Sequence, residues 1–117
     1  MTDAPTDVVD RQLDAYNRGD AESFVGAYAP HAVVRILPDT ILLCGRDDIR
    51  RHYSGLFAAH PDLKAAVAHR IVCGCFVIDE EIVNGRHSGE TVHAVAIYQI
   101  EESLISRLWL VPGVMRR

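Results

Sequence analysis

The residues best suited to chemistry in this chain are polar side chains that interrupt segments with the composition of β-strands. They are Arg35, His69, Asp79, Glu81 and His93. A carboxylate beside an imidazole can orient a general base or hold an imidazolium ion. If the pair faces a cavity, partial desolvation would shift the pKa values of both groups into a range useful for proton transfer. The set therefore indicates acid–base chemistry, with an arginine available for an anionic or enolate oxygen.

Two neighbouring strand candidates should bring part of this set together. Their connection begins with Asn-Gly and contains further turn residues, which is typical of an antiparallel hairpin. If the hairpin is centred near His87, Glu81 lies opposite His93 and Asp79 is a diagonal neighbour on the same face. Arg35 lies on an earlier strand and could approach the same site. We therefore take Glu81, His93, Asp79 and Arg35 as the candidate catalytic residues.

The same His–Glu pair also fits a structural role, especially where two subunits meet. Along residues 91–100, His93 shares its parity with Val95 and Ile97. The opposite parity holds Ala94, Ala96 and Tyr98. Small alanines would leave room for a ligand and the tyrosine would offer a hydroxyl, so this second set is the better candidate for a pocket wall. Both interpretations of the pair, as a pocket pair and as an interface pair, stay open at this level.

Three short amphipathic helices are predicted around these strands. The first is capped by Thr6 or Asp7 and stops at Gly19, where a left-handed residue is favoured. The second is capped by Asp20 and closed by Pro30. The third runs from position 46 to the His-Pro stop at 60–61. Their inward faces carry three tyrosines that either line a cavity or pack in the core: Tyr16, Tyr28 and Tyr53.

Six strand candidates complete the chain, at residues 32–37, 41–44, 63–73, 75–83, 91–100 and 104–111. Short connections make most of them antiparallel neighbours, and helices followed by a sheet indicate an α+β fold with the helices on one face. The last two strands are apolar on both faces, and three short helices can cover only one. We therefore expect a homodimer through the open sheet face, where Trp109 is either an interface anchor or a pocket wall.

The element order and several segments resemble the nuclear transport factor 2-like superfamily, in particular its SnoaL-like and steroid-isomerase-like branch. The matching segments are QLDAYNRGD, FVGAYAPHAVV, GRDDIRRHYSGLF, FVIDEEIV and HAVAIYQIEESLISRLW. The resemblance covers residues 8–111 and implies one domain over residues 1–117. It also implies a cone-shaped, curved antiparallel sheet with three helices on the concave side (a cystatin-like α+β barrel) around an apolar cavity.

The resemblance further implies a small-molecule function. The expected ligand is apolar or carbonyl-bearing, and the expected chemistry is isomerisation, cyclisation or dehydration without a cofactor. The alternative is a non-catalytic module for ligand binding or protein association. Ketosteroid isomerases of this superfamily use a helix tyrosine, a strand aspartate and a protonated acid. The matching positions here are Gln12, Ile36 and Ala96, so that mechanism is not expected. The expected ligand-binding residues are Tyr16, Tyr28, Tyr53, Tyr98, Ala96 and Trp109.

Composition narrows the other classes of function. The net charge of −4 and the scattered basic residues argue against nucleic acid as a partner. No apolar run reaches the roughly 20 residues of a membrane span, and the acidic N-terminal segment lacks the apolar stretch of a secretory signal. The expected location is therefore the cytoplasm. Three cysteines make a poor disulfide set, the histidines lack metal-ligand spacing, and no cofactor motif is present, so neither metal nor cofactor is expected.

Overall fold

The computed structural model describes residues 4–86 and 90–116, with side chains described as far as Gly113. These residues form three helices and one sheet. The helices are α1 (Pro5–Arg18), α2 (Ala21–Gly26) and α3 (Gly45–Ala59). The strands are β1 (Tyr28–Ile36), β2 (Thr40–Cys44), β3 (Lys64–Cys73), β4 (Phe76–Asn84), β5 (Thr91–Glu101) and β6 (Leu104–Arg116).

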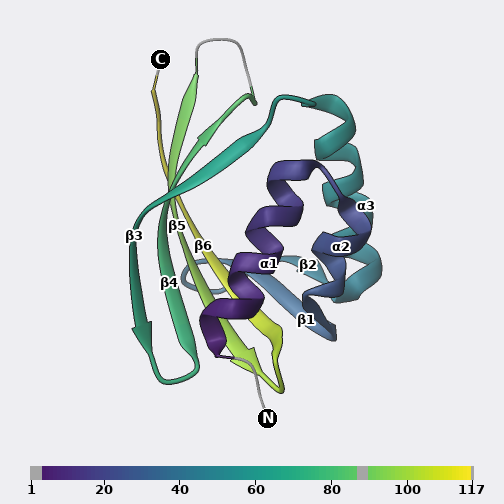
Figure 1. The fold of residues 1–117 in the computed structure, drawn as a ribbon, viewed down its shortest axis with the longest axis vertical. Helices are drawn as coiled ribbons and strands as arrows, with labels where there is room; N and C mark the ends of the chain where they lie inside the picture. Colours follow the sequence, from purple (N-terminus) through teal and green to yellow (C-terminus); the bar gives the residue numbers. More distant parts are fainter. Residues whose placement is uncertain (1–3, 87–89, 117) are drawn as a thin grey trace.

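The six strands form one curved sheet in the order β2-β1-β6-β5-β4-β3. Neighbouring strands are antiparallel except β1 and β6, which are parallel because most of the chain separates them. All three helices lie on one side of the sheet (Figure 1). The predicted α+β class is confirmed, and the sheet stays open, with β2 and β3 at its edges. Among the described helices, none has the length and apolar character required to cross a membrane.

The helix ends follow the predicted signals with two differences. Gly19 adopts the left-handed conformation after α1 (φ 68°), and Asp20 accepts a hydrogen bond from the Ser23 backbone N–H at the start of α2. However, α1 begins at Pro5, where a missing backbone N–H has no cost in the first helical turn. Tyr28 was expected on the second helix but instead opens β1, where it pairs with Ile105 of β6.

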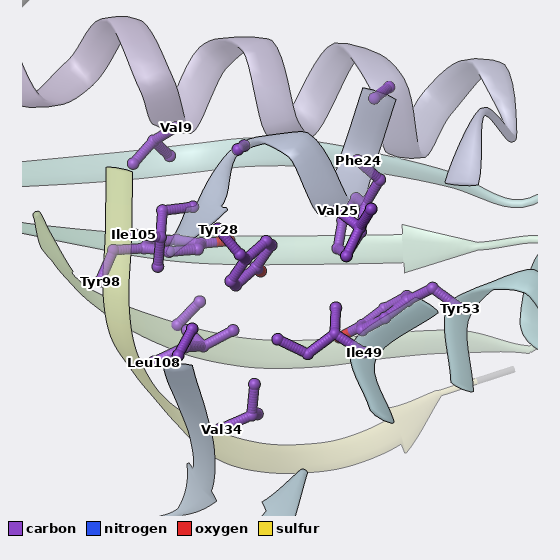
Figure 2. Packing of buried hydrophobic residues seen from close by; sticks show 14 of the residues in the cluster. Val9, Phe24, Val25, Tyr28, Val34, Ile49, Tyr53, Tyr98, Ile105 and Leu108 are labelled. Atoms are coloured by element: carbon purple, nitrogen blue, oxygen red, sulfur yellow. The ribbon is translucent and has the colours of Figure 1, made fainter. Parts of the chain in front are cut away.

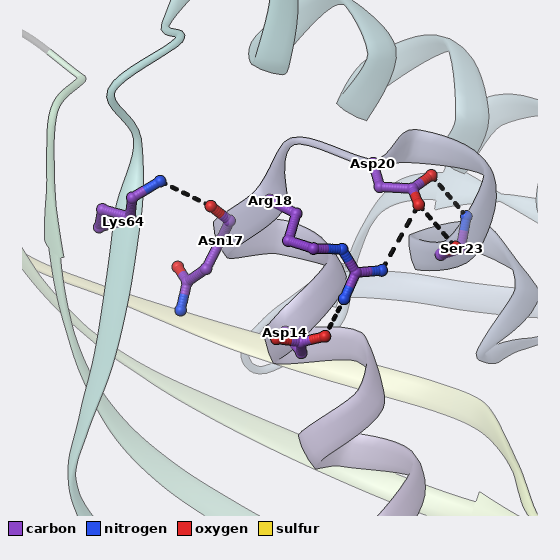
Figure 3. A network of polar contacts seen from close by, with 6 residues as sticks. All are labelled: Asp14, Asn17, Arg18, Asp20, Ser23 and Lys64. Atoms are coloured by element: carbon purple, nitrogen blue, oxygen red, sulfur yellow. Dashed lines mark hydrogen bonds and ion pairs between the residues drawn. The ribbon is translucent and has the colours of Figure 1, made fainter.

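A side-chain amide docks the end of α1 on the edge of the sheet. Asn17 Nδ2 donates to the Ala65 carbonyl oxygen (3.0 Å), and the Ala65 backbone N–H donates to Asn17 Oδ1 (2.7 Å). Lys64 Nζ donates to the Asn17 carbonyl oxygen at 2.6 Å (Figure 3). Edge-strand groups that would otherwise face water are thereby paired with the helix. The contact holds α1 beside β3.

The core fills the space between the helices and the inner face of the sheet. Its largest fully buried apolar residues include Tyr28, Phe24, Ile49 and Ile105 (Figure 2). The rings of Phe24 and Phe57 are 5.8 Å apart between centroids in an edge-to-face arrangement, within the range of favourable aromatic pairs. This packing joins all three helices to the sheet and provides a firm support for the cavity described next.

Candidate functional site

A cavity of about 330 Å³ lies between the helices and the inner face of the sheet. Most of its wall is apolar and comes from α1, α3 and all six strands. Its polar lining residues are Gln12, Tyr16, His52, Tyr53, Glu81, Arg86 and Tyr98. The volume falls at the lower end of the range for small-molecule sites, which are typically apolar with a few placed polar groups. The arrangement therefore fits a small ligand of about two rings.

Glu81 is the one acidic residue among the described residues that line this cavity. Alternation along β4 turns Asp79, Glu81 and Val83 inward and the intervening residues outward. The Tyr98 hydroxyl donates a hydrogen bond to Glu81 Oε2 at 3.2 Å. Burial raises the pKa of Glu81 to about 7, with a further rise from the charge of Asp79; the Tyr98 hydrogen bond and Arg70 act in the opposite direction. A carboxyl group that titrates near neutral pH can both take and return a proton.

The raised pKa of Glu81 should have a measurable cost in stability. Between its unfolded value of 4.5 and its folded value of about 7, the folded state binds more protons than the unfolded state. The free energy of unfolding contributed by this group therefore falls as the pH rises through that window. Glu81→Gln has no carboxyl group at this position and therefore no such pH dependence. From pH 5 to pH 8, we expect its free energy of unfolding to rise by up to about 3 kcal/mol relative to that of the parent protein.

Urea unfolding of both proteins at the two pH values checks this expectation. Glu80→Gln is the matched control, because Glu80 is adjacent in sequence and its pKa is lowered by hydrogen bonds to His69 and His93. An equal stability difference between Glu81→Gln and the parent at both pH values would contradict the raised pKa.

Behind Glu81, a buried ion pair fixes the charge of the second inward acid. Asp79 is 1% exposed, and Arg70 of β3 pairs with both of its carboxylate oxygens, at 2.7 Å from Nε and 2.9 Å from Nη2. The remaining Arg70 nitrogen donates to Asp10 of α1 at 2.7 Å. The bidentate geometry is the strong form of this interaction. Asp79 does not line the cavity, so it acts on Glu81 through its charge and its position.

Three tyrosines predicted as ligand-binding residues line the cavity: Tyr16, Tyr53 and Tyr98. Burial, followed by the charge of Glu81, raises the pKa of Tyr53 to about 12, and burial also raises the pKa values of Tyr16 and Tyr98. The phenols therefore stay protonated at physiological pH. The Tyr98 hydroxyl donates to Glu81, so Tyr16 and Tyr53 are the donors that could hold an oxygen of a ligand in the cavity.

Gln12 adds an amide to the same wall. Its side chain is 5% exposed, and Oε1 receives no hydrogen bond from any described residue. Buried polar atoms of this kind are uncommon and are usually satisfied by a partner. The position leaves an acceptor at the edge of the cavity. In the sequence, Gln12 stands out only because it occupies the position of the ketosteroid isomerase tyrosine.

The predicted pairing of Glu81 with His93 is wrong by one residue. Glu81 lies opposite Ala94, and His93 lies opposite Ile82. The last pair of the hairpin is Asn84 with Thr91, so its centre falls between residues 87 and 88 instead of at His87; these residues lie outside the described part. A slip of one residue turns a side chain to the other face of a sheet. Glu81 therefore faces the cavity and His93 does not.

On the outer face, His93 belongs to a different cluster. Its Nε2 lies 2.7 Å from Glu80 Oε2, and His69 Nδ1 lies 2.6 Å from Glu80 Oε1. This carboxylate–imidazole contact joins β3, β4 and β5. The geometry favours the structural interpretation of His93 over the pocket interpretation. Ala94 and Tyr98 line the cavity on the inner face of the sheet, as their parity along the strand predicts.

The other candidates also divide between the two faces. Arg35 forms an ion pair with Asp39 at 3.6 Å and lies beside Trp109 in the β1–β6 pairing, while the next residue, Ile36, lines the cavity. Neither Arg35 nor Trp109 lines the cavity. Tyr28 and Ala96 are fully buried but belong to the core beside the cavity and not to its lining. Arg35 is therefore too poorly placed to bind an anion in the cavity.

Two polar lining residues, His52 and Arg86, escaped the sequence analysis. His52 lies on α3 and Arg86 lies in the connection after β4. Partial burial and then the charge of Arg86 lower the pKa of His52. Neither residue belongs to a motif or to an apolar periodic pattern, so no local signal in the sequence marked them. Among the described residues, no group of three or more His, Cys, Asp or Glu side chains is arranged to hold a metal ion.

Comparison with known proteins decides the family. The family model of the SnoaL-like domain matches residues 9–108. The chain belongs to the SnoaL-like domain family. This confirms the predicted membership of the nuclear transport factor 2-like superfamily. No curated protein matches the chain.

Solved structures agree with this SnoaL-like assignment. An uncharacterised cystatin-fold protein from Novosphingobium aromaticivorans is 21% identical, with a TM-score of 0.86 over 93% of this chain and 98% of that one. A putative polyketide cyclase from Sinorhizobium meliloti is 25% identical, with a TM-score of 0.76 over 89% and 93%. A putative ketosteroid isomerase from Kribbella flavida is 16% identical, with a TM-score of 0.80 over 99% and 82%. These likenesses support the fold, which hosts more than one chemistry.

Proposed function

We propose that this SnoaL-like protein is a cofactor-independent isomerase or lyase that moves a proton on a mainly apolar, carbonyl-bearing small molecule. The observation that carries the proposal is Glu81: a carboxyl group with a pKa of about 7 in an apolar cavity, hydrogen-bonded by Tyr98. Isomerisation, cyclisation and dehydration of carbonyl compounds share one step, the removal of a proton from carbon beside the carbonyl group. The putative polyketide cyclase among the similar structures is consistent with this class.

The residues divide the step between them. The Glu81 carboxylate takes the proton from carbon and the electron pair of the C–H bond moves toward the carbonyl oxygen. The neutral hydroxyls of Tyr16 and Tyr53 are the donors in the cavity lining that could stabilise the resulting enolate. Glu81, now protonated, returns the proton to the same or a different carbon. Asp79 and Arg70 hold the local charge constant from behind the cavity.

Exchange of a carbon-bound proton tests this function directly. The probe is 2-tetralone in heavy water, with loss of the proton between its ring and carbonyl group followed by proton NMR. We expect exchange above the buffer rate, rising through about pH 7 as Glu81 ionises and then levelling off, because only the carboxylate is a base. Exchange no faster than in buffer at any pH would favour the alternative, a non-catalytic ligand-binding module.

The outer face of the sheet carries apolar residues that could serve the alternative function, protein association. Ile78, Ile97 and Trp109 are half-buried there, on the face opposite the helices. A second copy of the chain would cover them. The homodimer expected from the sequence stays a prediction.

A further inference from the structure

The described lining of the cavity includes one acidic side chain and one guanidinium group, and a ligand has to be compatible with both. Glu81 and Arg86 are the one acid and the one guanidinium among the described lining residues. Tyr16 and Tyr53 lie under the influence of both, since Glu81 raises and Arg86 lowers their pKa values. Arg86 is not among the charges that act on Glu81. Glu81 and Arg86 are separated by four residues along the chain, and Tyr16 and Tyr53 line the same cavity.

The backbone explains how Arg86 reaches this position. From Glu81, β4 continues for three residues, roughly 10 Å of extended chain, and then turns at Gly85. Gly85 has φ +90°, and a Cβ atom there would lie 2.3 Å from the Asp62 carbonyl oxygen. The turn is therefore pressed against the connection between α3 and β3, which only glycine permits. This places Arg86 at the rim of the cavity, where His52 of α3 also lies.

Arg86 also differs from the other arginines of the protein. Within residues 4–86 and 90–116, its side chain makes no hydrogen bond or ion pair, whereas every other arginine with a described side chain has a partner. Arg51 and Arg86 are both exposed, but only Arg51 is paired with an acid among the described residues. Because Arg86 lines an apolar cavity and is not paired with a described acid, the N–H donors of its guanidinium group are available to a ligand.

We propose that the ligand of this cavity is an apolar carboxylic acid whose carboxylate binds Arg86 at the rim while its other end lies at Glu81. Guanidinium and carboxylate match in a planar, bidentate geometry. Aliphatic side chains such as Leu13, Leu56 and Val92 surround the space between. This inference rests on the proposed function, because the carbonyl-bearing carbon of the ligand is placed at Glu81. The substrate class that follows is an apolar keto acid of about two rings.

Binding of two compounds that differ only in charge tests the proposal. The probes are 2-naphthylacetate and its neutral amide, 2-naphthylacetamide, compared by titration calorimetry near pH 7.5. We expect the acid to bind about 10- to 100-fold more tightly than the amide, as for a hydrogen bond to a charged group. Arg86→Gln should reduce the affinity for the acid to that for the amide and leave the amide unchanged. Arg51→Gln, on the exposed face of α3, is the matched control and should keep the preference.

Equal affinities for the two probes, failure of both to bind at millimolar concentration, or a preference that survives Arg86→Gln would each overturn the proposal. The outcome is separable from that of the proposed function. Proton exchange in 2-tetralone with equal affinities for the two probes would remove only the Arg86 assignment. A preference for the acid that depends on Arg86, without any proton exchange, would keep the carboxylate site and remove the enzymatic function.

Discussion

Replacement of Glu81 by glutamine is expected to lower proton exchange in 2-tetralone by about 100- to 10,000-fold, the usual range for loss of a general base. Glutamine keeps the size of the side chain and an oxygen that can accept the Tyr98 hydrogen bond. It lacks a group that takes a proton at neutral pH. The loss should therefore come from the chemical step. NMR exchange rates near pH 8, where the parent carboxyl is ionised, measure it.

The chain offers an unusually close control for this experiment. Glu80 is adjacent to Glu81 but faces the other side of the sheet, where it contacts His69 and His93. Glu80→Gln should keep the parent exchange rate, and its pH profile should still rise through about 7. Exchange that is undiminished in Glu81→Gln, or that falls equally in both variants, would show that Glu81 is not the base.

Much of the fold follows from local signals in the sequence. The Gly19 stop, the Asp20 cap and the Asn84-Gly85 turn are each read from a few residues, and each is present in the structure. Because β5 ends at Glu101 and β6 begins at Leu104, only Glu102 and Ser103 connect them, and both residues of this tight turn have positive φ. Such signals are local because caps and turns depend on neighbouring backbone groups. The helix-to-sheet order then selects the α+β class.

The site was predicted less well because it depends on register and on distant contacts. The sequence placed Tyr98 in the set expected to face the pocket, left Glu81 open between the pocket and an interface, and paired Glu81 with the wrong residue, His93. The register of the β4–β5 hairpin determines which glutamate shares a face with His93. A shift of one residue in the pairing places Glu80 on the face of His93 and Glu81 on the opposite face. Arg86 lines the same cavity as His52, and it is positioned there by Gly85, which packs against the connection between α3 and β3. No spacing along the chain encodes that contact.

Replacement of Arg70 by methionine is expected to destabilise the protein by about 3 to 5 kcal/mol, the usual cost of removing one partner of a buried ion pair. Asp79, at 1% exposure, would lose a bidentate partner with no route to water. The tie between β3 and Asp10 of α1 would be lost as well. Urea unfolding near pH 7 measures the change. Arg51→Met, which breaks an exposed pair with Asp48, should cost less than about 1 kcal/mol.

A double variant separates the buried charge from the lost packing. If the cost arises from an unpaired Asp79, then Arg70→Met combined with Asp79→Leu should recover most of the stability, because two apolar side chains can replace a buried pair. The same double variant removes the charge of Asp79, which raises the pKa of Glu81, and the charge of Arg70, which lowers it. A loss in Arg70→Met no larger than in Arg51→Met would mean that Asp79 tolerates burial without its partner, and the ion pair would then have no part in holding the charge behind Glu81.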